Sequence, residues 1–265
     1  MDSSAVIRQR QRDQWDAVAA SMPDFSSAPS TAYYRRREIA LLERAAGPLK
    51  GKRVLKLDLW NEAINTRILE WVANAGADAY GMDVSHVVSH RAKDNSRREN
   101  FDVSIARADI RQIPFRSDSF DVVYTMGTIE HIDEYKDTLR EIHRVLRVGG
   151  TAVIGVPNFW DPFLRPALVA VMEMLGKYPY APEKSFTRSE LKRDVENAGL
   201  AVTQMTGILL LPGVLRMLDL FLHVRRRWAA KSTEWFIKPF DAAEERFSWL
   251  DRFGYLVTAV ATKRR

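Results

Sequence analysis

Hydrophobic residues recur along this chain with two different periods, and segments with one period alternate with segments that have the other. Short segments rich in β-branched residues predict strands, whereas longer segments with apolar residues three or four apart predict amphipathic helices. Strands are predicted over residues 53–59, 77–83, 103–108, 120–124, 151–156 and 200–211, and helices over 64–75, 87–98, 135–146 and 189–198. This alternation indicates an α/β fold with a mainly parallel sheet and helices on both faces, because each connection has to cross back over the sheet.

The segments outside this alternation predict helical additions and one reversed strand. Helices are expected around Trp15, over 31–46, over 167–175 within an aromatic insertion at 157–184, and over 214–228. The alternating segment 254–261 predicts a last, antiparallel strand. We therefore expect one domain over residues 1–265, made of an N-terminal helical cap (1–49), a ligand-binding half (50–156) and a substrate-side half with insertions (157–265).

Composition narrows the class of protein. The chain has 265 residues and no cysteine, which excludes disulfides, thiolate metal sites and cysteine nucleophiles. Its net charge of +6 is spread along the chain, so no nucleic-acid partner is expected. Neither a signal peptide nor a membrane span is recognisable, and we expect a cytoplasmic protein. A basic cluster, Arg225, Arg226 and Arg227, follows Phe221 and permits a peripheral contact with a membrane surface.

Acidic residues follow three successive predicted strands: Asp58, Asp83 and Asp109. In an open α/β sheet, ligands bind beyond the carboxyl ends of the strands. A carboxylate after the second strand suits a ribose, because its two oxygens can accept from both sugar hydroxyls. Asp109 and Ile110 could hold an adenine ring through an acceptor oxygen and an apolar contact. The alternative for Asp83 and Asp109 is a structural role in a turn or cap.

Five ordered motifs strengthen this interpretation. They are Gly-Met-Asp-Val-Ser at 81–85, Ala-Asp-Ile-Arg-Gln-Ile-Pro-Phe at 108–115, Ser-Phe-Asp-Val-Val at 119–123, Ile-Glu-His-Ile at 129–132, and the segment from 139 to the glycines at 149 and 150. In this order and spacing, the chain resembles the class I S-adenosylmethionine-dependent methyltransferases, in particular the ubiquinone-type and small-molecule subgroup. The resemblance covers residues 50–156 well and the remainder more loosely.

The resemblance implies a Rossmann-like, seven-stranded sheet with an antiparallel last strand and S-adenosylmethionine as the cofactor. It implies that Asp83 binds the ribose and that Asp109 and Ile110 bind the adenine. Val84 is also expected against the cofactor. The loop after the fourth strand, with Met126 and Gly127, is expected to face the methyl group.

The first motif departs from the family. The family has an acid and a glycine-rich turn after the first strand, whereas this chain reads Lys-Leu-Asp-Leu-Trp-Asn-Glu at 56–62. Glycines at such a turn let the backbone approach the cofactor closely. We expect a turn of another shape, in which Asp58 or Glu62 receives the cofactor's ammonium group, and the alternative is weak cofactor binding. Lys56 would place a cation near the sulfonium unless it pairs with an acid such as Asp58.

His131 is the candidate general base, with Glu130 beside it, because a neutral imidazole can take a proton from a hydroxyl. The alternative is a structural role at a helix start, and no metal is expected there. Aromatic residues of the variable segments are expected to bind a small, apolar or aromatic acceptor: Trp15, Tyr33, Tyr34, Trp160, Tyr178 and Tyr180, together with Asn158 and residues 209–223. The alternative is that these aromatic side chains only pack a small cap over the sheet. The leading alternative function is a noncatalytic relative that serves as a binding or scaffold subunit. The sequence predicts no oligomeric state.

Overall fold

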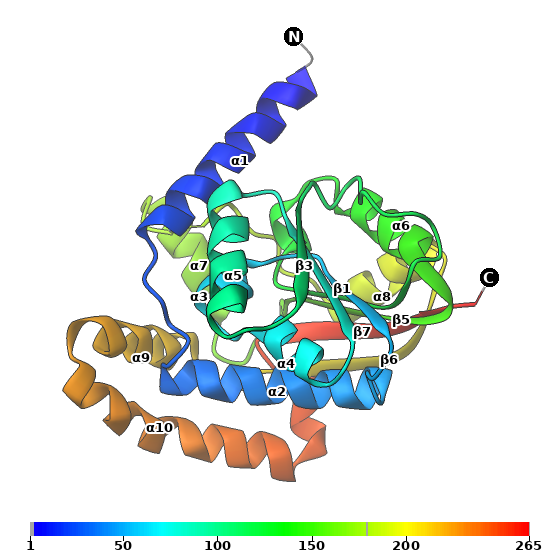
Figure 1. Cartoon of the computed structure of the whole chain (residues 1–265). Helices are drawn as coiled ribbons and strands as arrows, with labels where there is room; N and C mark the ends of the chain where they lie inside the picture. The colour runs from blue at the N-terminus through cyan, green and yellow to red at the C-terminus, as the bar shows by residue number, and fades with distance from the viewer. Residues whose placement is uncertain (1–2, 179, 265) are drawn as a thin grey trace.

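The computed structural model describes residues 3–178 and 180–264, without the side chains of residues 3–7 and 227–231. Its centre is a seven-stranded sheet in the order β3-β2-β1-β4-β5-β7-β6 (Figure 1). The strands are β1 (Arg53–Lys56), β2 (Asp78–Asp83), β3 (Val103–Arg107), β4 (Phe120–Met126), β5 (Leu146–Pro157), β6 (Leu200–Ile208) and β7 (Leu256–Lys263). Strands β1 to β5 pair in parallel, and β7 is antiparallel to both of its neighbours. The predicted sheet is confirmed.

Ten α-helices are described. They are α1 (Ser3–Ser21), α2 (Pro29–Ala46), α3 (Trp60–Ile64), α4 (Ile68–Asn74), α5 (His86–Arg98), α6 (Tyr135–Val145), α7 (Arg165–Met174), α8 (Arg188–Asn197), α9 (Gly213–Arg225) and α10 (Arg227–Arg246). The 3-10 helices are η1 (Ile129–His131) and η2 (Ser248–Arg252). The sheet separates two apolar cores, one beneath α2, α4 and α5 and the other beneath α6 and α8. Burial of apolar side chains on both faces is what holds the layers together.

The segment after β1 differs from the prediction. The strand ends at Lys56, a short helix that was not predicted, α3, follows it, and the expected helix over 64–75 begins only at Ile68, as α4. Arg67 takes a left-handed backbone conformation (φ 51°) between the two helices. The Glu62 carboxylate accepts hydrogen bonds from the backbone N–H groups of Ile68 and Leu69, at 3.0 and 3.1 Å, and so caps the N-terminus of α4. Apolar periodicity runs through this break, which is why the pattern predicts one helix.

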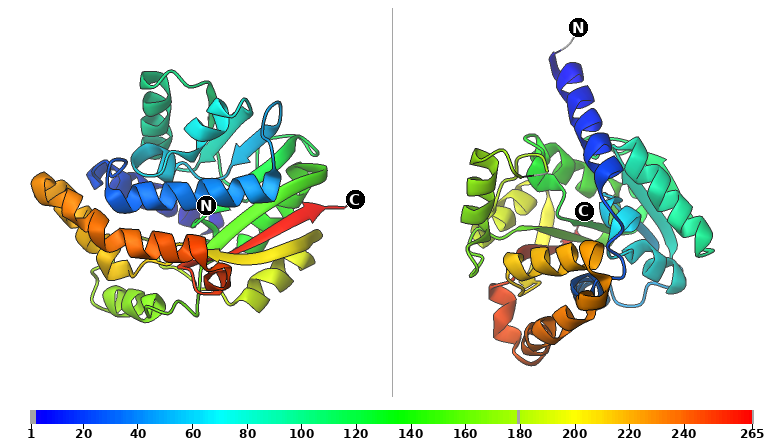
Figure 2. Two further views of the ribbon diagram at one scale, coloured as in Figure 1. Left: turned by 90° about the horizontal axis from the view of Figure 1, so that it is seen from below. Right: turned by 90° about the vertical axis from the view of Figure 1, so that its left-hand side faces the viewer.

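Helix α10 is absent from the sequence prediction. It lies beside α2 below the sheet in Figure 1, and Figure 2 shows both along their length. Arg37 of α2 pairs with Asp241 of α10 at 2.6 Å, and Tyr33 donates a hydrogen bond to the buried Glu244. These partners are more than 200 residues apart in sequence, so the local hydrophobic periodicity does not predict their contact. Helix α1 projects from the body on the side opposite to α10 (Figure 2).

Candidate active site

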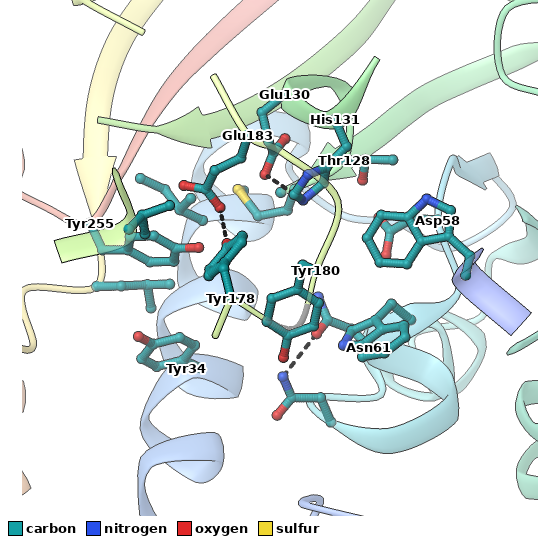
Figure 3. Close-up of a pocket in the computed structure, with 18 of the residues that line it drawn as sticks. Tyr34, Asp58, Asn61, Thr128, Glu130, His131, Tyr178, Tyr180, Glu183 and Tyr255 are labelled. Carbon is teal, nitrogen blue, oxygen red and sulfur yellow. Dashed lines mark hydrogen bonds and ion pairs between the residues drawn. The ribbon is translucent and has the colours of Figure 1, made fainter. Parts of the chain in front are cut away.

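A cavity of about 430 Å³ lies at the carboxyl edge of the sheet, which is within the usual range for a small-molecule site. Loops that follow β1, β2 and β4 form one wall, since parallel strands end at the same edge. Helices α1, α7 and α9 contribute to the other walls. In Figure 3, Asp58 lies across this space from Tyr34 and Tyr255. Of the predicted cofactor residues, the cavity is lined by Asp58, Asp83, Val84, Asp109, Ile110, Met126 and Gly127.

The bulky first loop fits because a glycine stands in the neighbouring strand. Leu59 is fully buried, and its side chain packs over Gly81 of β2. A Cβ on Gly81 would lie 2.5 Å from Leu59 Cδ2 and 2.7 Å from Leu69 Cδ1, both closer than van der Waals contact allows. The large side chain at 59 is therefore turned into the core, away from the cavity. Trp60 lines the cavity wall, with edge contacts to Trp15 and Tyr180.

Lys56 lies beneath the cavity floor and is completely buried. Its Nζ donates hydrogen bonds to the carbonyl oxygen and to Oδ1 of Asp58, each at 2.8 Å, and lies 3.8 Å from Glu62 Oε1. Burial alone would lower the pKa of Lys56, but the carboxylates of Asp58 and Glu62 raise it overall, so the amine is charged. The expected pairing with Asp58 is present. Oδ2 of Asp58 is buried without a hydrogen-bond partner.

The structure does not bring Glu62 to the cavity. Its carboxylate is occupied by the N-terminus of α4, and its side chain faces α5 instead. Burial raises the pKa of Glu62 to about 7. Of the two acids predicted for the ammonium group, only Asp58 lines the cavity. Glu62 is close in sequence, but α3 turns its side chain away from the cavity.

Asp83 ends β2 at the cavity wall. Its Oδ2 accepts from the Leu59 N–H at 2.9 Å and its Oδ1 from the Ser85 N–H at 2.8 Å. Burial raises the pKa of this carboxyl to about 6, against the lowering effect of the two N–H donors. Each oxygen has a second lone pair, so the carboxylate can still accept from a ligand.

Asp109 forms an ion pair with Arg111, which the sequence analysis did not predict. Arg111 donates to both of its carboxylate oxygens, and the Nη2–Oδ2 distance is 2.7 Å. Burial raises the pKa of Asp109, but the hydrogen bonds from Arg111 outweigh it and lower the pKa overall. Arg111 also donates to Glu134 and to Gln11 of α1. This arginine therefore joins the N-terminal helix to the cavity wall.

Glu130 and His131 lie on η1, at the cavity wall (Figure 3). Burial lowers the pKa of His131, which favours the neutral imidazole, and raises the pKa of Glu130 well above its ordinary value. His131 Nδ1 lies 3.1 Å from the Pro182 carbonyl oxygen, and only a protonated nitrogen can donate to a carbonyl. The Nε2 atom of the neutral ring therefore carries the free lone pair. Oε2 of Glu130 is buried without a partner.

The predicted acceptor residues divide into two groups. Trp15, Tyr34, Tyr178 and Tyr180 line the cavity, as do five positions between 209 and 217. Other predicted residues are used elsewhere: Tyr33 binds Glu244, Asn158 donates to the Gly254 carbonyl, and Trp160 is exposed. Arg165 and Glu183 also line the cavity and were not predicted individually, because their neighbours come from distant segments. Arg216 falls within the predicted segment 209–223, but its charge was not assigned a role.

Comparisons with known proteins agree with this geometry. Residues 63–154 match the family model described as a methyltransferase domain. The ubiquinone biosynthesis O-methyltransferase of Acinetobacter baumannii (strain AYE) is 26% identical over 176 residues, which are 63% of this chain and 71% of the relative. Among solved structures, the S-adenosylmethionine dependent methyltransferase from Mesorhizobium loti has a TM-score of 0.57 at 18% identity, covering 85% of this chain and 97% of that one. Phosphoethanolamine N-methyltransferase 2 of Haemonchus contortus, in complex with S-adenosyl-L-methionine, has a TM-score of 0.62 at 16% identity, covering 86% and 52%.

Residues 63–154 carry a methyltransferase domain, and the chain has the fold that the solved S-adenosylmethionine-dependent methyltransferases share. The family resemblance of its motifs is thereby confirmed, although its first loop departs from the glycine-rich pattern. In the described part of the chain, no helix is long and apolar enough to cross a membrane.

Proposed function

We propose that this methyltransferase transfers the methyl group to an O, N or C atom of a small, largely apolar or aromatic molecule. The supporting observation is the division of one cavity into two ends. Acidic residues at strand ends form one end, and tyrosines with aliphatic side chains of α7 and α9 form the other. The tyrosines supply flat apolar surface with a polar edge, which suits an aromatic acceptor.

The strand ends offer a binding group for each part of the cofactor. Asp83 would accept from the ribose hydroxyls of S-adenosylmethionine, and Val84 and Ile110 would contact its adenosine. Asp109, held by Arg111, would bind the adenine. The unpartnered Oδ2 of Asp58 is a buried acceptor, and a buried polar atom without a partner costs about 1–3 kcal/mol. An ammonium group there would supply the missing hydrogen bond.

The reaction needs alignment and one proton acceptor. When bound, the cofactor supplies an electrophilic methyl group that is displaced in line, so holding the acceptor close and excluding water accelerates the transfer. Met126 and Gly127 line the cavity, where they would face the methyl group. His131 Nε2 would take the proton of a hydroxyl acceptor, and the neighbouring Glu130 carboxyl would position that acceptor.

Cofactor binding and Asp83 provide the first test. Calorimetric titration with S-adenosylhomocysteine is expected to show binding, and Asp83→Ala is expected to weaken it more than about tenfold, since hydrogen bonds to a charged group contribute about 1.5–3 kcal/mol. The affinity of the unmodified protein should also fall as the pH is lowered through about 6, because protonation removes acceptor capacity from Asp83.

The control is Asp78→Ala, at the exposed opposite end of β2, which should leave the affinity unchanged. Equal affinity of the Asp83→Ala and unmodified proteins would remove Asp83 from the site. If neither cofactor form gives heat or a thermal shift at millimolar concentration, the noncatalytic scaffold is the better account.

A peripheral membrane contact is part of this proposal. Helix α9 exposes an apolar stripe, here the α9 stripe, consisting of Val214, Met217, Leu218, Phe221 and Val224. The side chains of Arg225 and Arg226 at its end are exposed, whereas that of Arg227 lies outside the described residues. An apolar face bordered by arginines fits an anionic bilayer surface.

We expect the protein to sediment with vesicles containing phosphatidylglycerol and much less with phosphatidylcholine vesicles. A Leu218→Ser/Phe221→Ser double variant should bind at least about tenfold more weakly, because each apolar side chain contributes about 1.5–3 kcal/mol when buried. Trp249→Ser, on η2 just after α10, is the matched control with a similarly exposed aromatic. Equal binding of both variants would exclude the α9 stripe as the contact.

A further inference from the structure

Arg216 stands out among the cations of the cavity wall because its hydrogen bonds go only to neutral oxygens. Its guanidinium donates to the hydroxyl groups of Ser30 and Thr31, the latter at 2.9 Å, and to Asn65 Oδ1 at 2.9 Å. No carboxylate of the described residues lies within 4.0 Å of it. Burial lowers the pKa of Arg216, because the charged guanidinium is removed from water and its neutral partners compensate only part of that loss.

The other cavity-lining arginines are neutralised by direct contact. Arg165 forms a bidentate ion pair with Glu183, and Arg111 forms a bidentate ion pair with Asp109. The nearest acid on the same helix as Arg216 is Asp219, whose carboxylate is occupied by the backbone N–H and hydroxyl of Ser30 and by a threonine hydroxyl. Asp219 thus reaches Arg216 only through the Ser30 hydroxyl.

Tyrosine side chains surround the guanidinium on the cavity side. Arg216 Cζ lies 4.4 Å from the centre of the Tyr34 ring, and Tyr34 and Tyr255 are nearly parallel, with an angle of 28° between their rings. The hydroxyls of Tyr34, Tyr180 and Tyr255 form no hydrogen bond with another described residue, although all three line the cavity (Figure 3). The cavity end thus offers hydrogen-bond donors together with one cation.

We infer that Arg216, with the hydroxyls of Tyr34 and Tyr180, binds a carboxylate group of the acceptor. The substrate class is therefore an aromatic or apolar carboxylic acid, and this inference rests on the proposed function. A guanidinium presents N–H groups in a planar fork that matches the two oxygens of a carboxylate. A single charge is favoured over a phosphate dianion, because Arg165 is already neutralised by Glu183 and Asp161 adds negative charge to the same wall.

The inference is tested with two small probes of nearly equal shape, benzoate and benzamide. Protein saturated with S-adenosylhomocysteine is titrated with each, and binding is followed by the fluorescence of the cavity tryptophans Trp15 and Trp60. Benzoate is expected to bind at least about tenfold more tightly than benzamide, as hydrogen bonds between charged groups imply. Arg216→Met should abolish this preference, and Arg216→Lys should retain part of it.

Arg140→Met, an exposed arginine of α6, is the matched control and should keep the full preference. Arg216→Gln provides a second neutral variant with polar hydrogen-bonding capacity if the methionine variant does not fold. Equal affinity for the two probes, or a benzoate preference that survives in the neutral variants, would overturn the inference. Failure to bind S-adenosylhomocysteine would instead overturn the proposed function, so the two failures are distinguishable.

Discussion

Replacing His131 with alanine is expected to lower kcat about 10²–10⁴-fold for an acceptor that must lose a proton, the usual contribution of a positioned general base. The reason is local: Nδ1 is held by the Pro182 carbonyl oxygen, so Nε2 is the nitrogen that can take a proton. The measurement is the single-turnover rate of methyl transfer to the acceptor that the unmodified enzyme uses. Similar S-adenosylhomocysteine affinity in both proteins would show that the cavity is intact.

The pH profile sharpens this prediction. Burial lowers the pKa of His131 from its ordinary value of 6.5, and the base acts only when it is unprotonated. The rate should therefore be constant around pH 7 and fall with an apparent pKa below 6.5. Glu130→Gln is the companion variant: burial raises the pKa of Glu130 well above its ordinary value and glutamine preserves the shape of the side chain, so we expect a loss below about tenfold. A His131→Ala rate within threefold of the unmodified rate would exclude the base role.

Lys56→Met is expected to produce the largest loss of stability. The amine lies at hydrogen-bond distance from Asp58 and 3.8 Å from Glu62, and all three side chains are buried. Removing one partner of a buried ion pair typically costs about 3–5 kcal/mol, because the remaining charge has lost both its solvent and its counter-charge. The free energy of unfolding, measured by urea denaturation monitored by circular dichroism, should fall by that amount.

Two further variants separate this explanation from a general loss of packing. Lys50→Met removes an exposed lysine three residues before β1 and should change the free energy of unfolding by less than about 0.5 kcal/mol. Lys56→Met combined with Glu62→Gln should recover part of the loss, since one of the unpaired carboxylates has become neutral. If the Lys56→Met variant is as stable as the unmodified protein, the buried charges do not depend on one another.

Much of the fold could be predicted because it depends on local repetition. Alternating strand and helix periods predict the parallel sheet, although β5 begins at Leu146, five residues before the predicted start at 151, and includes the glycines at 149 and 150. Helix α10 was missed because its partners on α2 lie far away in sequence. The break between α3 and α4 was missed because it depends on the side chain of Glu62, and apolar periodicity carries no information about a cap supplied from the preceding helix.

By itself, the sequence determined the class of protein and the candidates at the strand ends, because a parallel sheet gathers the residues that follow its strands at one edge. Asp58, Asp83 and Asp109 could be named for that reason. The tertiary structure decided which side chains are free to act. It assigned Glu62 to a helix cap and Arg111 to Asp109, and it left Arg216 without a carboxylate. Those outcomes depend on distances between segments far apart in the chain, and composition and spacing do not contain them.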